Sequence, residues 1–344
     1  MTKIFDWKEK INESELDEIS SAIKEGKLVI FPTETVYGIG ASIYNDDALK
    51  NIFITKGRAQ DNPLIIHVSS KEMIKEIVTD ISDIENKLID AFMPGPFTLI
   101  LNKKKHISNI VSANLDTVGI RMPDSKIART IIEKSNTPIA APSANLSTKP
   151  SCTNLNDLLE DFNNKVPYII DEGASKIGVE STVVKVINGI PTILRPGKIT
   201  PEDIYEVTNS VNIDKNINEV KTGKVESPGM KYKHYAPSSK CLLVYMDNEN
   251  DMINEINKHI AKNTYVIGYK EHQNLINTNN FYSFGSINNY EEISSNIFSL
   301  LREVDRNKPE LIIIEGLKKE GIGIAVMNRL IKAASHNYIE KLDK

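Results

Sequence analysis

Strand-like and helix-like segments alternate along most of this chain, and that alternation restricts its fold more than any other feature. Short apolar runs at residues 28–31 and 64–68 have the length and composition of buried strands, and the stretch 46–53 between them has helical periodicity. Strands that alternate with helices in this way are typical of α/β proteins. The sequence therefore predicts an α/β fold.

The alternation is interrupted between residues 209 and 239. This stretch is rich in Asn, Asp, Lys and Gly, which is typical of a linker. The chain has 344 residues, more than one hydrophobic core usually holds. A second, smaller α/β pattern follows, with strands predicted at 241–245, 265–269 and 311–315. We therefore predict a first domain at 1–208, a linker at 209–239 and a C-terminal domain at 240–344.

The composition is that of an ordinary globular protein, with 40% hydrophobic and 26% charged residues. Forty-two Lys and Arg oppose 46 Asp and Glu, and the formal net charge of −4 is a poor basis for binding nucleic acid as the main task. The two cysteines, Cys152 and Cys241, lack metal-ligand spacing, and the N-terminus lacks a signal-peptide pattern. We therefore expect a cytoplasmic protein with no disulfide framework, zinc site or membrane span.

A dense polar cluster directly follows the first predicted buried strand. Residues 33–37 read Thr-Glu-Thr-Val-Tyr and supply two hydroxyls, a carboxylate and a phenol. The carboxyl end of a strand is where ligands favour binding in open α/β sheets. The cluster therefore suits the polar groups of a bound amino acid. The alternative is an ordinary polar turn between Pro32 and Gly38.

Cations form the next group of candidate site residues. In Lys56-Gly57-Arg58, Lys offers a point charge, Arg a fork for two oxygens and Gly room for close approach, which together suit a phosphate. Arg121 lies in a short apolar strand, and a buried Arg needs an anionic partner, either a protein carboxylate or a substrate carboxylate. His67 also lies in an apolar strand, where a lone His is more often a satisfied core residue than a ligand.

Small, hydroxyl-bearing and cationic residues recur at later strand ends. They are Ser143-Ala144-Asn145 with Ser151 just beyond, Glu180-Ser181-Thr182, and Arg195. Small residues allow the backbone to approach a ligand, and Ser and Asn side chains can hydrogen-bond a phosphate. Each motif alone is weak, but together they form a consistent set at strand ends.

Taken in order, these motifs resemble the YrdC domain over roughly residues 10 to 208. The matching segments are Pro-Thr-Glu-Thr-x-Tyr-Gly from 32, Lys-Gly-Arg from 56, Asn-Pro-Leu-Ile-x-His from 62, Pro-Gly-Pro-x-Thr from 94, Val-Gly-Ile-Arg-x-Pro from 118, Ala-Pro-Ser-Ala-Asn from 141, Glu-Ser-Thr-Val-Val from 180 and Leu-Arg-Pro-Gly from 194. Residues 227–237 and 321–330 are similar to the linker and the C-terminal domain of the long, two-domain members of the family.

The resemblance implies a fold, a reaction and partners. It implies a twisted, open, mixed sheet with helices, followed by a smaller Rossmann-like α/β domain. The expected enzyme is a nucleotidyltransferase that condenses L-threonine, bicarbonate and ATP to L-threonylcarbamoyladenylate and pyrophosphate, for modification of the tRNA adenosine beside the anticodon. Downstream tRNA threonylcarbamoyl-transferase proteins would use the product, with direct tRNA binding weak or absent. Mg²⁺ would accompany the triphosphate, with no dedicated metal ligands in the chain.

The resemblance also implies roles for individual residues, with Lys56 and Arg58 as the catalytic pair. The residues expected to bind ATP are Lys56, Arg58, Asn62, Thr117, Ser143, Asn145, Ser151, Arg195, Tyr232 and Tyr235. The residues expected to bind L-threonine are Thr35, His67, Arg121, Ala141 (through its backbone) and Ser181. The linker, with Tyr232 and Tyr235, would fold over the nucleotide as a lid that excludes water.

Two other functions are compatible with the same motifs. One is an RNA-binding or ribosome-associated module that uses a concave basic cavity of the same fold, against which the net charge argues. The other is a carbamoyl-adenylate enzyme with a different acceptor, as in hydrogenase maturation. Such enzymes carry additional zinc-finger regions, for which two cysteines are too few.

Overall fold

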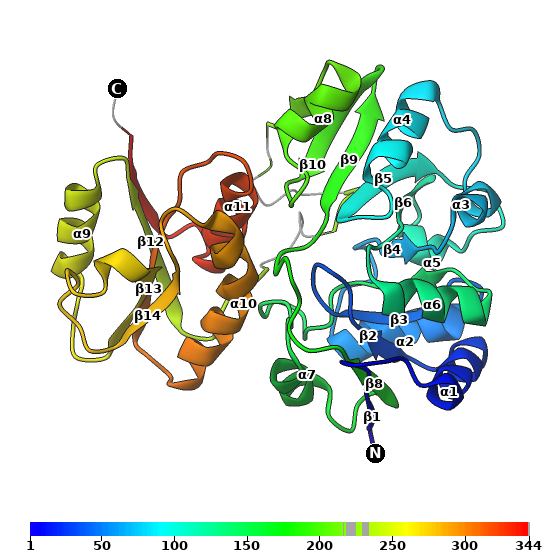
Figure 1. The fold of residues 1–344 in the computed structure, drawn as a ribbon, viewed down its shortest axis with the longest axis horizontal. Coiled ribbons are helices and arrows are strands. Elements are labelled where there is room, and N and C mark those ends of the chain that lie inside the picture. The colour runs from blue at the N-terminus through cyan, green and yellow to red at the C-terminus, as the bar shows by residue number, and fades with distance from the viewer. Residues whose placement is uncertain (216, 218–224, 229–233, 343–344) are drawn as a thin grey trace.

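The computed structural model describes residues 1–215, 217, 225–228 and 234–342, which form two lobes (Figure 1). In the described part of the chain, the larger lobe is built on one eleven-stranded mixed sheet. In sheet order the strands are β1 (Lys3–Asp6), β8 (Tyr168–Asp171), β2 (Val29–Phe31), β3 (Gly38–Ser42), β7 (Ile139–Ala140), β4 (Ile65–His67), β6 (Thr117–Arg121), β5 (Phe97–Asn102), β9 (Thr182–Ile187), β10 (Ile190–Arg195) and β11 (Asn212–Ile213).

Helices accompany this sheet along the chain. They are α1 (Glu13–Lys24), α2 (Asp46–Lys56), α3 (Lys71–Ile77), α4 (Asp83–Phe92), α5 (Asn109–Ser112), α6 (Lys126–Ser135), α7 (Leu155–Phe162) and α8 (Pro201–Thr208). Strands β4 and β6 run parallel, whereas β7 runs antiparallel to both β3 and β4. The prediction of a mixed sheet with helices is therefore confirmed.

Local sequence explains where the helix that carries the first cation begins and ends. Helix α2 begins after Asn45, whose Oδ1 accepts from the backbone N–H of Ala48 at 2.9 Å, and it ends at Gly57, which has a left-handed φ of 61°. Both are standard helix caps. The left-handed φ favours glycine at this helix end. A Cβ at Gly57 would meet no atom within 4 Å, and the expectation that this glycine also leaves room for a ligand remains a prediction.

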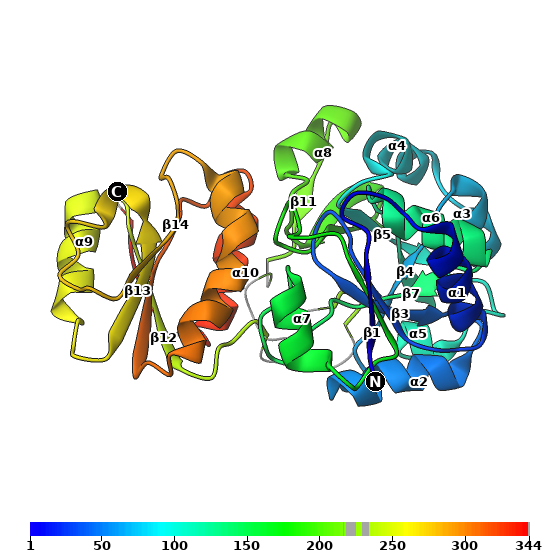
Figure 2. The same ribbon diagram turned by 60° about the horizontal axis from the view of Figure 1, so that its bottom comes forward.

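The smaller lobe is a five-stranded sheet in which each described strand pair is parallel. Its strands, in sheet order, are β14 (Phe281–Gly285), β13 (Thr264–Tyr269), β15 (Leu311–Glu315), β12 (Lys240–Met246) and β16 (Tyr338–Lys341). Its helices are α9 (Glu249–Lys258), the 3₁₀ turn η1 (Lys270–His272), α10 (Tyr290–Arg306) and α11 (Gly323–Ala333). Helices α10 and α11 lie on the side facing the larger lobe and α9 on the other side (Figures 1 and 2). This is the predicted Rossmann-like arrangement.

The described residues form two large hydrophobic cores, and the core of the smaller lobe includes residues from outside that lobe. The larger core gathers around β2, β4, β5 and β6. The smaller core contains residues of its own sheet and helices, and also Val36, Val179 and Tyr235, which precede that lobe in sequence. The lobes therefore share apolar packing in the region between them.

Two further sequence predictions can be compared with the structure: the linker between the lobes, and the absence of a membrane span. Within the predicted linker, residues 212–213 form β11 against β10, while Tyr232 lies outside the described residues. None of the helices described is both long and apolar enough to span a membrane.

Candidate active site

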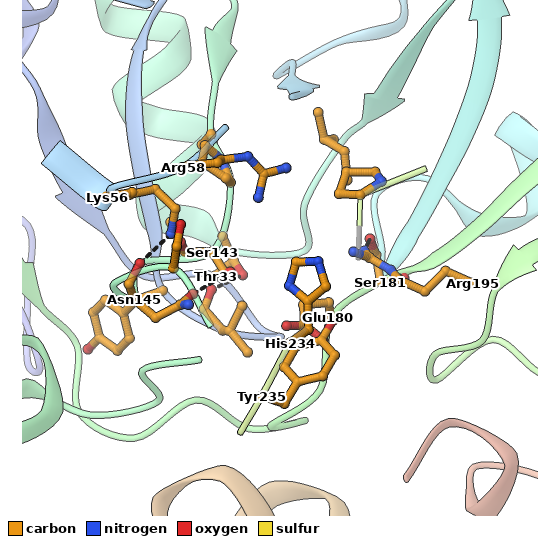
Figure 3. A pocket seen from close by; sticks show the side chains of 18 of the residues that line it. Thr33, Lys56, Arg58, Ser143, Asn145, Glu180, Ser181, Arg195, His234 and Tyr235 are labelled. Carbon is orange, nitrogen blue, oxygen red and sulfur yellow. Dashed lines mark hydrogen bonds between the residues drawn. The ribbon is translucent and has the colours of Figure 1, made fainter. Parts of the chain in front are cut away.

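A polar cavity opens among strand ends of the larger lobe, on the side where the smaller lobe packs (Figure 3). Its open volume is about 60 Å³, room for a few water molecules but not for a nucleotide. The side chains and backbone that line it come from Thr33, Val36, Tyr37, Gly38, Lys56, Arg58, Ile65, His67, Arg121, Ala141, Pro142, Ser143, Asn145, Ser147, Thr148, Glu180, Ser181, Arg195, Pro228, His234 and Tyr235.

Lys56 forms one wall of the cavity because of its place on helix α2. Leu49, Ile52 and Phe53 form the buried face of this helix, and Lys56 continues that face at helical spacing, so it is only 2% exposed. Its Nζ donates to the backbone oxygens of Ser143 and Asn145, each at 2.5 Å. Burial, and then the charge of Arg58, lower the pKa of Lys56 to about 7. At neutral pH, Lys56 is therefore protonated in only part of the molecules.

Arg58 lies just past the helix end and extends toward the same space (Figure 3). Its Nη2 donates to the backbone oxygens of Asn62 and Pro63, at 3.4 and 3.1 Å. Ser143 Oγ donates to Asn145 Oδ1 at 2.6 Å, which orients the loop beneath Lys56. Two cations and a hydroxyl thus converge in one part of the cavity, an arrangement suited to phosphate oxygens.

A second part of the cavity lies at the ends of β4 and β6. His67 and Arg121 are register partners on these parallel strands, and both are 4% exposed. Nη2 of Arg121 lies 2.7 Å from Oε1 of Glu34. The sequence left open whether the partner of Arg121 is a protein or a substrate carboxylate, and in this structure it is the carboxylate of Glu34.

Several buried atoms in this second part lack a hydrogen-bond partner among the residues described. They are Oε2 of Glu34, Nε of Arg121 and Nδ1 of His67, whereas Oε1 of Glu34 and Nη2 of Arg121 form an ion pair with each other. Burial, and then the nearby Arg121 charge, lower the pKa of His67 to about 3, so its imidazole is neutral. Buried polar groups are normally satisfied, and this cluster is therefore suited to a small polar ligand.

The opposite wall is formed by residues just before β9 and at the end of β10. The backbone oxygen of Ser181 accepts from Nε and Nη2 of Arg195, at 3.2 and 3.0 Å. Oε1 of Glu180 accepts from Oγ of Ser151 at 2.6 Å. Burial opposes ionisation of Glu180, but the charges of Arg329 and Arg195 lower its pKa to about 2. The carboxylate is therefore ionised, and it holds Ser151 behind the cavity wall.

His234 and Tyr235 close the cavity on the side of the smaller lobe (Figure 3). The Tyr235 ring stacks on Phe298 of α10, with centroids 5.1 Å apart. Burial, and then the charge of Arg58, lower the pKa of His234 to about 3, so this imidazole is also neutral. Its Nε2 has no partner in the described part of the chain.

The structure brings most of the predicted site residues together. Those that line the cavity are Lys56, Arg58, Ser143, Asn145, Arg195 and Tyr235 from the nucleotide set and His67, Arg121, Ala141 and Ser181 from the threonine set. Ser151 and Thr35 lie one contact behind it, through Glu180 and through Thr33 (Oγ1 to Oγ1, 2.8 Å).

Two predicted nucleotide residues do not line the cavity. Asn62 is buried, and its Oδ1 has no partner among the described residues. Oγ1 of Thr117 donates to Oε1 of Glu226 at 2.9 Å. The proposed roles of both residues remain predictions.

Sequence reasoning gave no individual role to Glu34, Glu180 or His234, although Glu34 belonged to the polar cluster expected to hold an amino acid and all three lie inside motifs that it quoted. Each is a titratable residue next in sequence to a predicted site residue, and this position could have identified it as a further candidate. For metals the structure offers little, since the described residues contain no group of three or more His, Cys, Asp or Glu side chains that could hold an ion.

The chemistry available here is anion binding. Lys56, Arg58, Arg121 and Arg195 are cationic side chains around one small space, against two buried carboxylates. The nearby Cys152 thiol is not activated, because burial raises its pKa well above its usual range. Placement and charge neutralisation, rather than a covalent intermediate on the protein, are what this site can provide.

Comparison with known families matches both lobes. A family model described as "Telomere recombination", for Sua5, YciO and YrdC proteins, matches residues 21–197. A second, described as the C-terminal domain of threonylcarbamoyl-AMP synthase, matches residues 199–335.

Curated relatives are similar over nearly their whole length. The chain is 41% identical to the threonylcarbamoyl-AMP synthase of Pyrococcus abyssi, over 99% of this chain and 100% of that protein. It is 38% identical to the Bacillus subtilis protein of the same name, over 95% of each.

Solved structures agree with the sequence matches. The crystal structure of P. abyssi Sua5 complexed with L-threonine has a TM-score of 0.94 and 40% identity, over 98% of this chain and 99% of that chain. Escherichia coli YciO, at 18% identity and a TM-score of 0.52, covers 57% of this chain and 96% of that chain, and it shares the fold of the larger lobe.

Proposed function

The chain belongs to the Sua5–YciO–YrdC family in its long, two-domain form, and from this premise we propose that it is an enzyme that makes threonylcarbamoyl-AMP. Relatives named for this activity are 38–41% identical and match both lobes. A member of the family with the same two-lobe structure has been crystallised with L-threonine. The activity therefore belongs to the whole chain, with L-threonine as a substrate.

The observation that carries the threonine site is the cluster of unpartnered buried atoms around Arg121. A zwitterionic amino acid needs a cation for its carboxylate, an anion or carbonyl for its ammonium, and a partner for its hydroxyl. Arg121 and neutral His67 line the cavity, and Glu34 lies behind Arg121, so the three kinds of group are close together. The exchange of Glu34 for the substrate carboxylate would leave Arg121 charged and paired at each stage.

The nucleotide would occupy the other part of the cavity, with Lys56, Arg58 and Arg195 at its phosphates. When threonine reacts with bicarbonate, an N-carboxylated threonine forms and water leaves. A carbamate oxygen then attacks the α-phosphorus of ATP, the bond to the bridging oxygen of the β-phosphate breaks, and pyrophosphate departs. The three cations stabilise charge on the phosphate oxygens as this bond breaks. Mg²⁺, held through the triphosphate, would add charge neutralisation.

His234 and Tyr235 form part of a lid over the nucleotide site. The open volume of about 60 Å³ is too small for ATP while both side chains fill the cavity. We infer that His234 moves when ATP binds and then covers it, which would exclude water from the reactive phosphate, while Tyr235 stays stacked on Phe298.

Pyrophosphate release from ATP tests the proposal directly. We expect release that requires both L-threonine and bicarbonate, and that falls when serine replaces threonine. Release that is indifferent to threonine would contradict the proposal.

The RNA-binding alternative is not favoured, since the matched full-length relatives are named as synthases. Salt-sensitive RNA binding without threonine-dependent turnover would support that alternative instead. A cytoplasmic location remains an expectation from sequence.

A further inference from the structure

Two sets of polar contacts between the lobes differ in their relation to the cavity. The outer set joins α10 to α7. Nη2 of Arg302 lies 2.7 Å from Oδ2 of Asp161, and Arg306 pairs with Asp157 and Glu160. None of these five residues lines the cavity.

The inner set joins α11 to the cavity wall. Arg329 of α11 is completely buried, and its Nε donates to Oε2 of Glu180 at 2.9 Å. Its Nη2 lies 3.5 Å from the backbone oxygen of Glu180, and its Nη1 donates to Oδ1 of Asn328 at 3.0 Å. A buried guanidinium with this many contacts is fixed in one orientation.

Glu180 transmits this orientation into the site. One carboxylate oxygen accepts from Arg329 and the other accepts from Ser151, so a single side chain connects α11 to a residue behind the cavity wall. The next residue, Ser181, lines the cavity and accepts hydrogen bonds from Arg195. The pKa of Glu180, about 2, agrees with a carboxylate that stays ionised between two cations.

Tyr235 is the second residue that Arg329 supports. The guanidinium carbon of Arg329 lies 5.5 Å from the centroid of the Tyr235 ring, which also stacks on Phe298. A cation at this distance from an aromatic ring attracts it. Arg329 and Phe298 of the smaller lobe therefore pack against Tyr235, whose side chain lines the cavity.

The backbone that precedes Glu180 also packs directly against helix α10 of the smaller lobe. Gly178 has a φ of +82°, and a Cβ there would lie 2.2 Å from the backbone oxygen of Ser294 in α10. Oγ of Ser294 donates to the backbone oxygen of Ile177 at 2.7 Å. The segment that carries Glu180 therefore takes its position from the smaller lobe.

We propose that Arg329 is a positioning residue for the reaction, and that docking of the smaller lobe completes the active site through the contacts of Arg329 with Glu180 and Tyr235. This inference rests on the proposed function. Without the guanidinium, Glu180 becomes a buried carboxylate that has lost its partner in α11, and Ser151 and Ser181 lose a fixed neighbour. Misplacement of substrate-holding groups by about 1 Å is enough to cost about 100-fold in rate.

The test compares two arginine substitutions that both remove a contact between the lobes. Arg329→Met removes the inner contact, and Arg306→Met removes an outer ion pair of a partly exposed arginine that touches no cavity residue. We expect kcat/KM for ATP in threonine-dependent pyrophosphate release to fall about 100-fold in Arg329→Met and less than threefold in Arg306→Met. Arg329→Lys keeps a cation and should recover part of the loss. Thermal unfolding, measured in parallel, sets an assay temperature at which each variant is folded.

A double variant distinguishes positioning from mere docking. Because Arg329 acts through the Glu180 carboxylate, Glu180→Gln combined with Arg329→Met should lose no more activity than the worse single variant. Losses that multiply, or an Arg329→Met enzyme with wild-type kcat and KM, would overturn the proposal while leaving the synthase function intact.

A wild-type protein without threonine-dependent release would contradict the proposed function, and calorimetry then tests Arg329 separately. ATP affinity about tenfold weaker in Arg329→Met than in wild type would support the positioning role. Equal affinities would overturn it.

Discussion

In both lobes, a buried histidine lies near a carboxylate at the ends of strands, but the two lobes differ in how many of these polar atoms form hydrogen bonds. In the larger lobe, Glu34, His67 and Arg121 meet at strand ends with buried atoms that lack hydrogen-bond partners in the part of the chain described. Burial and the neighbouring Arg121 lower the pKa of His67 to about 3. The charges of Arg121 and Glu34 are paired, but hydrogen-bonding atoms remain free, as in a binding site before its ligand arrives.

In the smaller lobe the equivalent edge is complete. Glu315, at the end of β15, accepts from the backbone N–H of Tyr269 at 2.7 Å and lies 3.1 Å from Nδ1 of His272. Nε2 of His272 lies 2.8 Å from Oε1 of Glu249. The hydrogen bond with Glu315 raises the pKa of His272 to about 9, so this fully buried imidazole is charged at neutral pH.

The difference distinguishes a sheet edge that binds a ligand from a sheet edge that only stabilises the fold. Both edges combine histidine with a carboxylate at the carboxyl ends of strands, where a Rossmann-like sheet usually binds its ligand. Of these two edges, only that of the larger lobe has described side chains with buried polar atoms that lack a hydrogen bond. We therefore expect substitutions to affect substrate binding in the larger lobe and stability in the smaller one.

The largest expected effect is on stability, from His272→Leu. This change leaves Glu315 as a buried carboxylate without its cation, and breaking such a pair costs about 3–5 kcal/mol. Urea denaturation followed by circular dichroism measures the loss, with His259→Leu as the control, because His259 is partly exposed and pairs only with Glu255 at the surface. A changed KM for threonine in folded His272→Leu protein would refute the assignment of this edge as structural.

The second prediction concerns Arg121→Gln. Loss of a charged hydrogen bond to the substrate carboxylate, about 1.5–3 kcal/mol, should raise KM for threonine by roughly 10- to 100-fold. Arg129→Gln, an arginine in the same lobe that lies 3.7 Å from Asp124 and is about one-third exposed, is the matched control and should leave KM unchanged. Equal KM values in the two variants would show that Arg121 pairs only with Glu34.

A smaller effect is expected from pH, through Lys56. With its pKa at about 7, Lys56 of the free enzyme loses its proton as the pH rises, whereas phosphate binding requires the charged form. We expect kcat/KM for ATP to fall about fivefold between pH 7 and pH 8. In Lys56→Arg, which stays charged, the same profile should be flat. A wild-type profile that does not fall in this interval would contradict the role of Lys56 as a titrating phosphate ligand.

The most gradual effect is the pH dependence of stability from His272. Its folded pKa of about 9 lies above the ordinary value near 6.5, so its contribution is fully present below about pH 6.5 and is lost as the pH rises through 9. The difference in unfolding free energy between wild type and His272→Leu should therefore narrow between pH 6.5 and pH 9.5. A constant difference would mean that His272 is neutral in the fold.

Local pattern predicted much of the fold, and its failures have physical causes. The strand predicted at 28–31 is observed as β2, and the helix predicted at 46–53 is observed as α2. Strand β3, which reads Gly-Ile-Gly-Ala-Ser, was missed because its glycines carry no strand preference. A Cβ on Gly40 would lie 2.6 Å from Ile139 and 2.7 Å from Phe31, so tertiary packing selects this strand.

The site was predictable as a set of positions but not as a set of pairs. Motifs gave Lys56, Arg58 and Arg195 with the phosphate chemistry that suits them. The ion pair of Arg121 with Glu34 joins residues 87 positions apart, and that of Arg329 with Glu180 joins residues 149 positions apart. No local pattern encodes such pairs, which exist only once the sheet and the second lobe have assembled.

The presence of Val36 and Val179 in the core of the smaller lobe has a consequence for how such a protein can change over evolutionary time. A gene truncated after the first lobe would encode a protein with two valines newly exposed to water beside its catalytic cavity, and apolar surface of this kind promotes self-association. Loss of the second lobe would therefore favour polar replacements at both positions. Shared packing therefore makes the joining of two once-separable units difficult to reverse by a single deletion.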